Sequence, residues 1–186
     1  MTTNLFTGDQ VKLTAEEPEN MSKAFARWSR DSEYHRMLNF SPGVLWSDKK
    51  WKEWLEKDLE KDSQDEFFFA IHTTADDRLI GFIGLMSPEW NQRDAWIVIG
   101  IGDRNDWGKG YGTDAMRLLL KYAFTELNLF RVTLGLFDYN RRAYRSYEKV
   151  GFVLEGRQRN IVNREGRRWD VLVMGILKSE WEQRSG

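Results

Sequence analysis

The stretch from Ile97 to Met116 constrains this chain most, because it joins an apolar run, a glycine-rich turn and a helical segment. The apolar run Ile97–Ile101 predicts a buried strand. Gly108, Gly110 and Gly112 then stand at alternate positions, and glycine allows positive φ and close approach of the backbone to a ligand. The segment that follows has apolar residues at helical spacing, namely Ala115, Met116, Leu119, Tyr122 and Ala123. The first amides of a helix lack internal partners and lie at the positive end of its dipole, so this arrangement predicts a site for a phosphate or pyrophosphate.

The loop matches neither of the two common nucleotide-binding motifs. The dinucleotide pattern G-x-G-x-x-G requires glycine three residues after Gly110, where Thr113 stands. The P-loop pattern requires Ser or Thr directly after its Gly-Lys pair, but Gly110 follows Lys109. From the loop alone, a turn that caps a helix and binds nothing therefore stays open as an alternative.

Composition limits the classes of function. The chain has 186 residues, of which 41% are hydrophobic, which is typical of one globular domain with its own core. It has no apolar run of about eighteen residues and no basic-then-apolar N-terminus, so we expect neither a membrane span nor a secretion signal. With no cysteine, and with His35 and His72 far apart in sequence, we expect no metal. The net charge is −1, which is not the strongly basic balance of a nucleic-acid-binding protein. We expect a cytoplasmic protein without nucleic acid or membrane partners.

Periodicity and turn residues predict a mixed α/β domain with a mainly antiparallel N-terminal half. The predicted strands are Gln10–Thr14, Phe67–His72, Leu79–Met86, Trp96–Ile101, Arg131–Phe137, Val150–Glu155 and Trp169–Leu177. The predicted helices are Glu19–Arg30, a helix capped by Ser47 that runs to Leu59 with Trp51, Trp54 and Leu55 facing inward, the helix after the glycine loop up to about Leu127, and Asn140–Lys149. No repeat or linker divides the sequence, so residues 1–186 are predicted to form a single domain.

A second informative stretch runs from Asn140 to Phe152. Asn140 is a good N-cap at a strand-to-helix junction, and it shares a helix face with Tyr147. A phenol next to a bound cofactor can donate a proton to a leaving group, while half-buried packing is the competing interpretation of Tyr147. Arg142 and its neighbouring arginines are available for phosphate contacts or for solvent.

Taken in order, these stretches resemble the GNAT acetyltransferases, in the branch of ribosomal-protein N-terminal and spermidine acetyltransferases. The residues that carry the resemblance are Trp107–Ala115, Tyr122–Leu129, Asn140–Ala143, Tyr147–Phe152, Asp170 and Val173–Leu177. The resemblance implies an α/β GNAT fold, with a mixed, mostly antiparallel central sheet that is splayed at the cofactor site and flanked by helices. It also implies acceptor-side helices in about residues 1–66 and an acetyl-CoA-binding core in about residues 67–177.

The resemblance implies acetyl-CoA as the acetyl donor. The family's loop, Gln/Arg-x-x-Gly-x-Gly/Ala, falls on Trp107–Gly112, so Trp107 stands where Gln or Arg is usual. In the family the strand before the loop splays from its neighbour and pantetheine hydrogen-bonds to it, and here this strand is Ile97–Ile101. The implied contacts of acetyl-CoA are Ile99, Ile101, Gly108, Lys109, Gly110, Tyr111, Gly112, Thr113, Asn140, Arg142 and Tyr147.

Since no cysteine can carry the acetyl group, we expect direct transfer from the thioester to a neutral amine. By resemblance, a backbone N–H near Ile99 meets the oxyanion, and Tyr147 protonates or hydrogen-bonds the departing thiolate. The strand contains no carboxylate to act as a base, and Asp94 lies just upstream. Near neutral pH, deprotonation costs about 4 kcal/mol for an amine of pKa about 10.4 but under about 1 kcal/mol for an α-amine of pKa about 8. The sequence therefore favours an easily deprotonated amine or a water relay.

The acceptor site is expected under the N-terminal helices and the Phe40–Val44 loop. Candidate partners for a cationic group are Glu33 and Glu89, and candidate walls are Tyr34, Trp90, Trp28, Trp46 and Trp51. The competing interpretations are core packing for the tryptophans and solvent exposure for the carboxylates.

Three functions stay open at this point. The first is acetylation of a protein N-terminal α-amine, and the second is acetylation of a small amine such as a polyamine or an aminoglycoside-like antibiotic. The third is a non-catalytic CoA-binding module. The sequence does not report the oligomeric state, and since many relatives are monomers or dimers, a homodimer is only an expectation.

Overall fold

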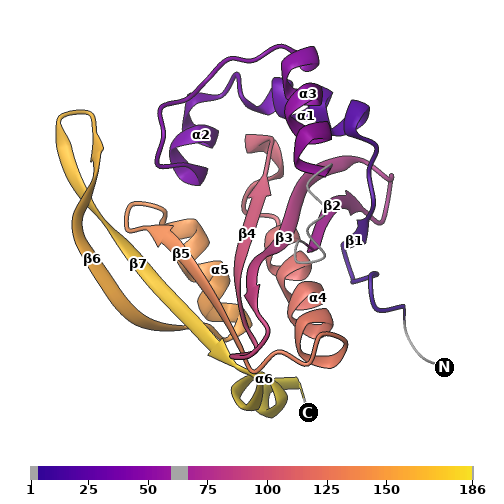
Figure 1. The fold of residues 1–186 in the computed structure, drawn as a ribbon, viewed down its shortest axis with the longest axis vertical. Coiled ribbons are helices and arrows are strands. Elements are labelled where there is room, and N and C mark those ends of the chain that lie inside the picture. Colours follow the sequence, from indigo (N-terminus) through magenta and orange to yellow (C-terminus); the bar gives the residue numbers. More distant parts are fainter. Residues whose placement is uncertain (1–3, 60–66, 186) are drawn as a thin grey trace.

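The computed structural model describes residues 4–59 and 67–185, which contain one seven-stranded sheet flanked by helices (Figure 1). In spatial order the strands are β1 (Val11–Thr14), β2 (Phe67–Thr73), β3 (Leu79–Glu89), β4 (Asp94–Ile101), β5 (Arg131–Phe137), β7 (Arg167–Leu177) and β6 (Val153–Arg164). All neighbouring pairs are antiparallel except β4 and β5, which are parallel. This mixed, mostly antiparallel sheet confirms the predicted fold class.

Helices pack on both faces of the sheet. On one face lie α4 (Tyr111–Thr125) and α5 (Arg141–Val150), and Phe124 of α4 and Ile83 of β3 belong to the same buried cluster. On the other face lie α1 (Pro18–Trp28) and α3 (Asp48–Leu59), and Phe25 of α1 packs edge-on against Phe82 of β3. Phe82 and Ile83 are adjacent, and neighbouring strand residues point to opposite faces. The remaining helices are α2 (Ser32–Leu38), the short 3-10 helix η1 (Arg104–Asp106) and α6 (Lys178–Ser185).

The sequence did not reveal α2 and α6, because helices of seven and eight residues are too short to display a clear apolar period. The start of α2 is fixed locally, since the side chain of Asp31 accepts the N–H of Glu33 at 2.9 Å. None of the helices in residues 4–59 and 67–185 is both long enough and apolar enough to cross a membrane.

Three details of the prediction were wrong. The strand expected at Trp96–Ile101 begins two residues earlier, at Asp94, so it does contain a carboxylate. The strand expected at Val150–Glu155 begins only at Val153, because Val150 ends α5 and Gly151 caps that helix at a φ of +117°. Trp54 was expected to face inward but is 44% exposed, while Leu55 on the same helix is buried. The predicted cap of α3 is confirmed, because the hydroxyl of Ser47 accepts the N–H of Lys50 at 3.3 Å.

A buried carboxylate ties the start of α4 to β1. Asp114 is 6% exposed, and its Oδ2 accepts the N–H of Gln10 at 2.8 Å and the N–H of Val11 at 3.0 Å. Gly8 lies so close that a Cβ there would be 2.6 Å from the same carboxylate. A negative charge in the first turn also suits the helix dipole. Asp114 therefore fixes the end of α4 at which the glycine loop enters the helix.

We expect Asp114→Ala to lower the free energy of unfolding by about 3 kcal/mol, because the buried N–H of Val11 and the partly buried N–H of Gln10 would lose a charged acceptor. Urea denaturation followed by circular dichroism measures this loss. A matched control is Asp103→Ala, since the carboxylate of Asp103 accepts the exposed N–H of Asn105 and its loss should cost about 1 kcal/mol. Equal losses in the two variants would contradict the role assigned to Asp114.

Candidate functional site

The parallel strands β4 and β5 separate halfway along their length. Their pairing covers Asp94, Ala95 and Trp96 and then stops, although β4 continues to Ile101 and β5 to Phe137. In the part of the chain that the structure describes, no strand pairs with the second half of β4 on this side. A cavity of about 770 Å³ opens there. The splay predicted from the resemblance is confirmed, and the backbone edge of β4 is available to a ligand.

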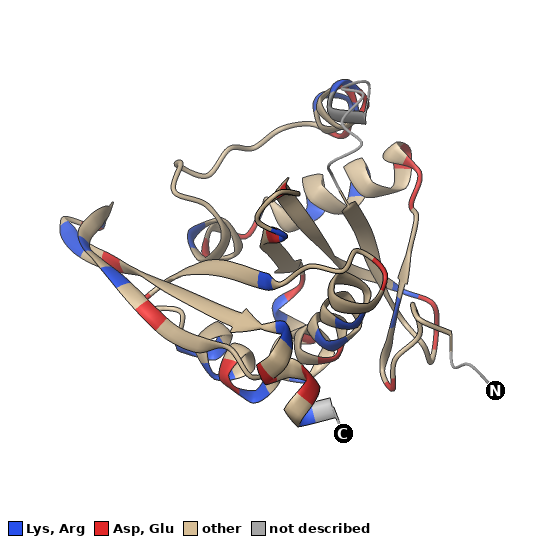
Figure 2. Cartoon of the chain, turned by 60° about the horizontal axis from the view of Figure 1, so that its bottom comes forward, with Lys and Arg blue, Asp and Glu red and all other residues tan. Residues whose placement is uncertain are grey.

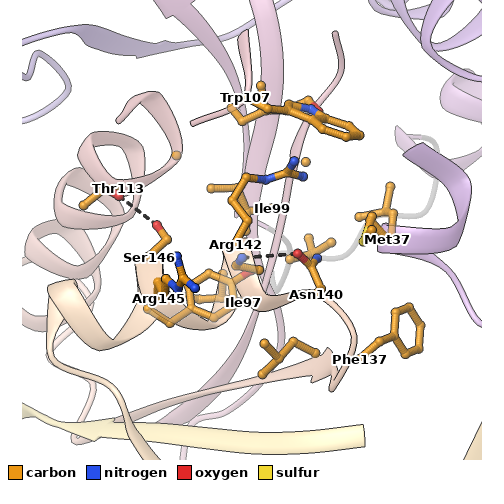
Figure 3. A pocket seen from close by; sticks show the side chains of 18 of the residues that line it. Met37, Ile97, Ile99, Trp107, Thr113, Phe137, Asn140, Arg142, Arg145 and Ser146 are labelled. Carbon is orange, nitrogen blue, oxygen red and sulfur yellow. Dashed lines mark hydrogen bonds between the residues drawn. The ribbon is translucent and has the colours of Figure 1, made fainter. Parts of the chain in front are cut away.

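The cavity brings together all the residues predicted to contact acetyl-CoA. They come from β4, from the glycine loop with the start of α4, and from α5: Ile99, Ile101, Gly108, Lys109, Gly110, Tyr111, Gly112, Thr113, Asn140, Arg142 and Tyr147. Figure 3 shows Thr113 on α4 facing Ser146 on α5, and their hydroxyl oxygens are 2.7 Å apart. This hydrogen bond joins the two helices whose first turns border the cavity.

Two glycines give the loop a backbone that other residues rarely adopt. Gly108 has a φ of +77°, and Gly110, the N-cap of α4, has a φ of +95°. A Cβ at Gly108 would meet nothing within 4 Å, so the backbone there borders open space. Because the N-cap has no side chain, nothing covers the unpaired first-turn amides of α4 from this position. The loop therefore has the geometry of a phosphate-binding concavity.

An ion pair between a buried carboxylate and a half-exposed arginine holds the loop in place. Asp106 is 5% exposed, and its two carboxylate oxygens accept hydrogen bonds from Arg78 at 3.2 and 3.1 Å. The Nζ of Lys109 lies 3.7 Å from the same carboxylate. Arg78 precedes β3, so this pair fixes the loop to the sheet on the side away from α5.

Trp107, which stands where the family usually has Gln or Arg, joins the end of β4 to α5. Its indole N–H donates to the carbonyl of Ile101 at 2.7 Å. The guanidinium of Arg142 lies over the ring, 3.8 Å from its centre, and reaches up to it from α5 (Figure 3). This cation–π contact holds a positive charge at the cavity. Burial lowers the pKa of Arg142, so an anionic ligand would relieve the cost of keeping that charge there.

α5 presents Asn140 and Tyr147 to the cavity. Asn140 is 8% exposed, and its side-chain oxygen accepts the N–H of Ala143 at 3.2 Å, which confirms the predicted N-cap. Tyr147 lies two turns further along the helix and packs against the main core. Burial raises the pKa of Tyr147 to about 12. The phenol therefore keeps its proton throughout the neutral range.

The end of the cavity away from α4 is apolar, and the sequence indicated only part of it. Tyr34 and the loop that begins at Phe40 were predicted there, and the structure adds Met37, Leu38, Met86, Trp96 and Phe137. These residues come from α2, the loop after it, β3, β4 and β5, so their neighbourhood depends on the tertiary fold. The sequence contained one indication of this surface. Trp96 stands between Ala95 and Ile97, which are buried against α4, and because alternate strand residues point to opposite faces, Trp96 faces away from α4.

Three predicted acceptor contacts do not line the cavity. Glu33 forms an ion pair with Arg104 at 2.5 Å. Glu89 ends β3, and Trp90 follows it and packs against Phe67, with ring centres 6.2 Å apart. The remaining candidate walls lie in an aromatic cluster around Phe25 under the N-terminal helices: Trp28, Trp46 and Trp51.

Comparison with known proteins agrees with this geometry. The family described as Acetyltransferase (GNAT) domain matches residues 12–153. The "Probable N-acetyltransferase YjcK" of Bacillus subtilis is 38% identical over 125 residues, which are 67% of this chain and 68% of that protein. The "Putative ribosomal N-acetyltransferase YdaF" of the same species is 36% identical over 107 residues, 58% of each chain. Among solved structures, the spermidine N-acetyltransferase from Vibrio cholerae in complex with CoA and spermine has a TM-score of 0.81 at 27% identity, covering 93% of this chain and 98% of that one.

We expect Gly108→Ala to weaken the binding of CoA by at least about tenfold, because the added methyl group would enter the space bordered by the loop. Isothermal titration with CoA measures the affinity. The control is Gly166→Ala in the turn between β6 and β7, where φ is +71° and a Cβ would also meet nothing within 4 Å. Both variants should lose about 1–2 kcal/mol of stability from the left-handed backbone, but only the first should lose affinity. Unchanged affinity in Gly108→Ala would contradict the assignment of the loop.

Proposed function

The chain belongs to the GNAT family of N-acetyltransferases, and on that premise we propose that it acetylates the α-amine at a protein N-terminus. The family supplies the reaction, which is transfer of an acetyl group from acetyl-CoA to an amine. The proposal concerns the identity of the amine and the residues that serve the transfer.

The scarcity of carboxylates in the cavity carries the proposal. Among the residues that the structure describes, Asp106 is the only carboxylate in the lining, and Arg78 already binds both of its oxygens. Asp94 does not line the cavity. A base is needed most by amines of pKa about 10, whereas an α-amine of pKa about 8 is partly neutral at physiological pH. An α-amine that loses its proton to water therefore suits this cavity.

On the donor side, the glycine loop supports binding of the diphosphate. The free amides at the start of α4 supply hydrogen-bond donors, and Lys109 and Arg142 supply positive charge. The side-chain oxygen of Asn140 is occupied by Ala143, so the amide NH₂ of Asn140 is the group that would donate to pantetheine. The unpaired edge of β4 offers the backbone partners, and the N–H near Ile99 would stabilise the oxyanion.

On the leaving-group side, Tyr147 would hydrogen-bond the sulfur as the carbon–sulfur bond breaks and the nitrogen–carbon bond forms. A phenol of pKa about 12 is a weaker acid than a thiol of pKa about 8.5, so complete proton transfer to the thiolate would cost about 5 kcal/mol. A hydrogen bond from Tyr147 without complete transfer is therefore the better description. The surplus proton of the attacking nitrogen leaves to solvent.

A polyamine is the second candidate acceptor. It is favoured by the likeness to the Vibrio cholerae enzyme, which was solved with CoA and spermine. It is disfavoured because Glu33, which the sequence offered as a partner for a cationic group, is paired with Arg104 and does not line the cavity.

We expect Tyr147→Phe to lower kcat by about tenfold to a hundredfold with little change in the affinity for acetyl-CoA, because only the hydrogen bond to the leaving sulfur is lost. In the wild type, kcat/KM should rise as the α-amine deprotonates near pH 8. Deprotonation of Tyr147 should not lower kcat/KM below about pH 11, which is one unit under its pKa. Tyr144→Phe on the same helix, which packs against the core outside the cavity, is the matched control. Unchanged turnover in Tyr147→Phe would rule out this role.

The acceptor is tested by mixing the protein with acetyl-CoA and an amine panel and reading the release of free thiol. We expect peptide α-amines to give kcat/KM values at least about tenfold above those of spermidine and of an aminoglycoside. Spermidine as the best acceptor would overturn the proposed acceptor. Binding of acetyl-CoA without turnover of any amine would instead favour a non-catalytic module.

A further inference from the structure

The acceptor end of the cavity exposes large apolar side chains. Phe40 is 59% exposed, Met86 43% and Trp96 42%, and all three line the cavity. Met86 and Trp96 are paired across β3 and β4, so their side chains lie on the same side of the sheet. Solvent-exposed apolar surface gathered around one opening is typical of a binding site.

Several charged groups near this surface already have partners. Glu33 and Asp31 both pair with Arg104, and Arg36 pairs with Glu165 at 2.7 Å. The segment between α2 and α3, residues 39–47, contains no Lys, Arg, Asp or Glu and is tan throughout in Figure 2. The surface therefore has apolar area to offer, and the carboxylates near it are already in contact with arginine side chains.

One wall of this surface is held in place from outside the cavity. The Nη2 of Arg164 on β6 donates to the carbonyls of Asn39 at 2.5 Å, Phe40 at 3.0 Å and Ser41 at 3.3 Å. The ring of Phe40 packs edge-on against Phe137, with centres 5.0 Å apart. Phe40 is therefore exposed yet fixed, which suits a rigid wall of a binding site.

The other walls can adapt. Met37 and Met86 are unbranched and polarizable, so they can fit apolar groups of different shapes. Figure 3 shows Met37 and Phe137 on the side of Asn140 away from Thr113 and Ser146. The apolar surface is thus continuous with the proposed transfer site and lies at the end opposite the glycine loop.

We propose that this surface binds a large apolar side chain next to the amine, so that the preferred acceptor is a peptide whose first residue is Met, Leu or Phe. The inference rests on the proposed function and specifies its substrate class. The occupant is the acceptor itself because Trp96 directly precedes the unpaired half of β4, where the acetyl group would be presented. Phe137 lies close to Asn140 in the chain, at the same cavity.

The experiment compares peptides that differ only in the first residue, with Met, Leu, Phe, Ser or Asp at that position, and includes phenethylamine and spermidine. We expect kcat/KM for the three apolar first residues to exceed that for Ser by at least about tenfold, since a few buried methylene groups discriminate by about that factor. Asp should be the poorest of the five, because its carboxylate would be brought against the apolar walls without a partner.

Two variants test the surface itself. Met86→Glu should remove most of the preference for Met over Ser and raise kcat/KM for spermidine, while the affinity for acetyl-CoA stays unchanged. Phe40→Ala should also reduce the preference. The matched control is Leu154→Glu on β6, because Leu154 is likewise 43% exposed but does not line the cavity; this variant should keep the wild-type preference.

The outcomes separate this inference from the proposed function. Equal or better turnover of the Ser peptide would overturn the apolar preference and leave N-terminal acetylation intact. Turnover of phenethylamine but of no peptide would overturn the proposed function and support the apolar site. If Met86→Glu changed the oligomeric mass but not the preference, the surface would be a contact between copies and the inference would be overturned. Binding of acetyl-CoA without turnover of any amine would overturn both.

Discussion

The site depends on a parallel strand pair that stops halfway. Backbone N–H and C=O groups inside a protein need partners, so the second half of β4 is a place where a ligand can supply what a neighbouring strand does not. Contacts at both ends support the gap. Pairing with β5 continues up to Trp96, and at the other end the carbonyl of Ile101 accepts the indole N–H of Trp107. The fold thus holds open a strand edge in the middle of a sheet.

The cavity at this gap has two chemically different ends. Toward α4 it has helix amides, left-handed glycines and the side chains of Lys109 and Arg142, which suit phosphate. Toward α2 it is apolar, and the carboxylate of Glu33 is paired with Arg104, which also pairs with Asp31. Tyr147 stands between as a phenol whose proton is retained by burial. The two ends differ in polarity because different elements border them. The start of α4 contributes polar backbone groups to one end, and the strand faces contribute apolar side chains to the other.

The donor side could be predicted from the sequence because each of its parts is local. A glycine loop between strand and helix, and an asparagine cap followed two turns later by tyrosine, are patterns within about fifteen residues, and the structure brings these residues to one cavity. The acceptor side could not be predicted in the same way. Phe40, Met86 and Phe137 are far apart in sequence, and α2, which brings Met37 to the cavity, is too short to show a period. Glu33 was predicted to be available for a cationic acceptor because the sequence alone does not show that it pairs with Arg104.

The sequence by itself determined the order of the seven strands and of the helices α1, α3, α4 and α5, the N-caps at Ser47 and Asn140, the glycine loop and the family to which the chain belongs. These features depend on residues that are neighbours in the chain, so periodicity and motif spacing encode them. Only the tertiary structure decided where β4 leaves β5, why Trp107 can replace a polar residue by holding Arg142, and which side chains surround the acceptor end. Those features are contacts between distant segments, and their geometry is set by sheet register and helix packing rather than by any local pattern.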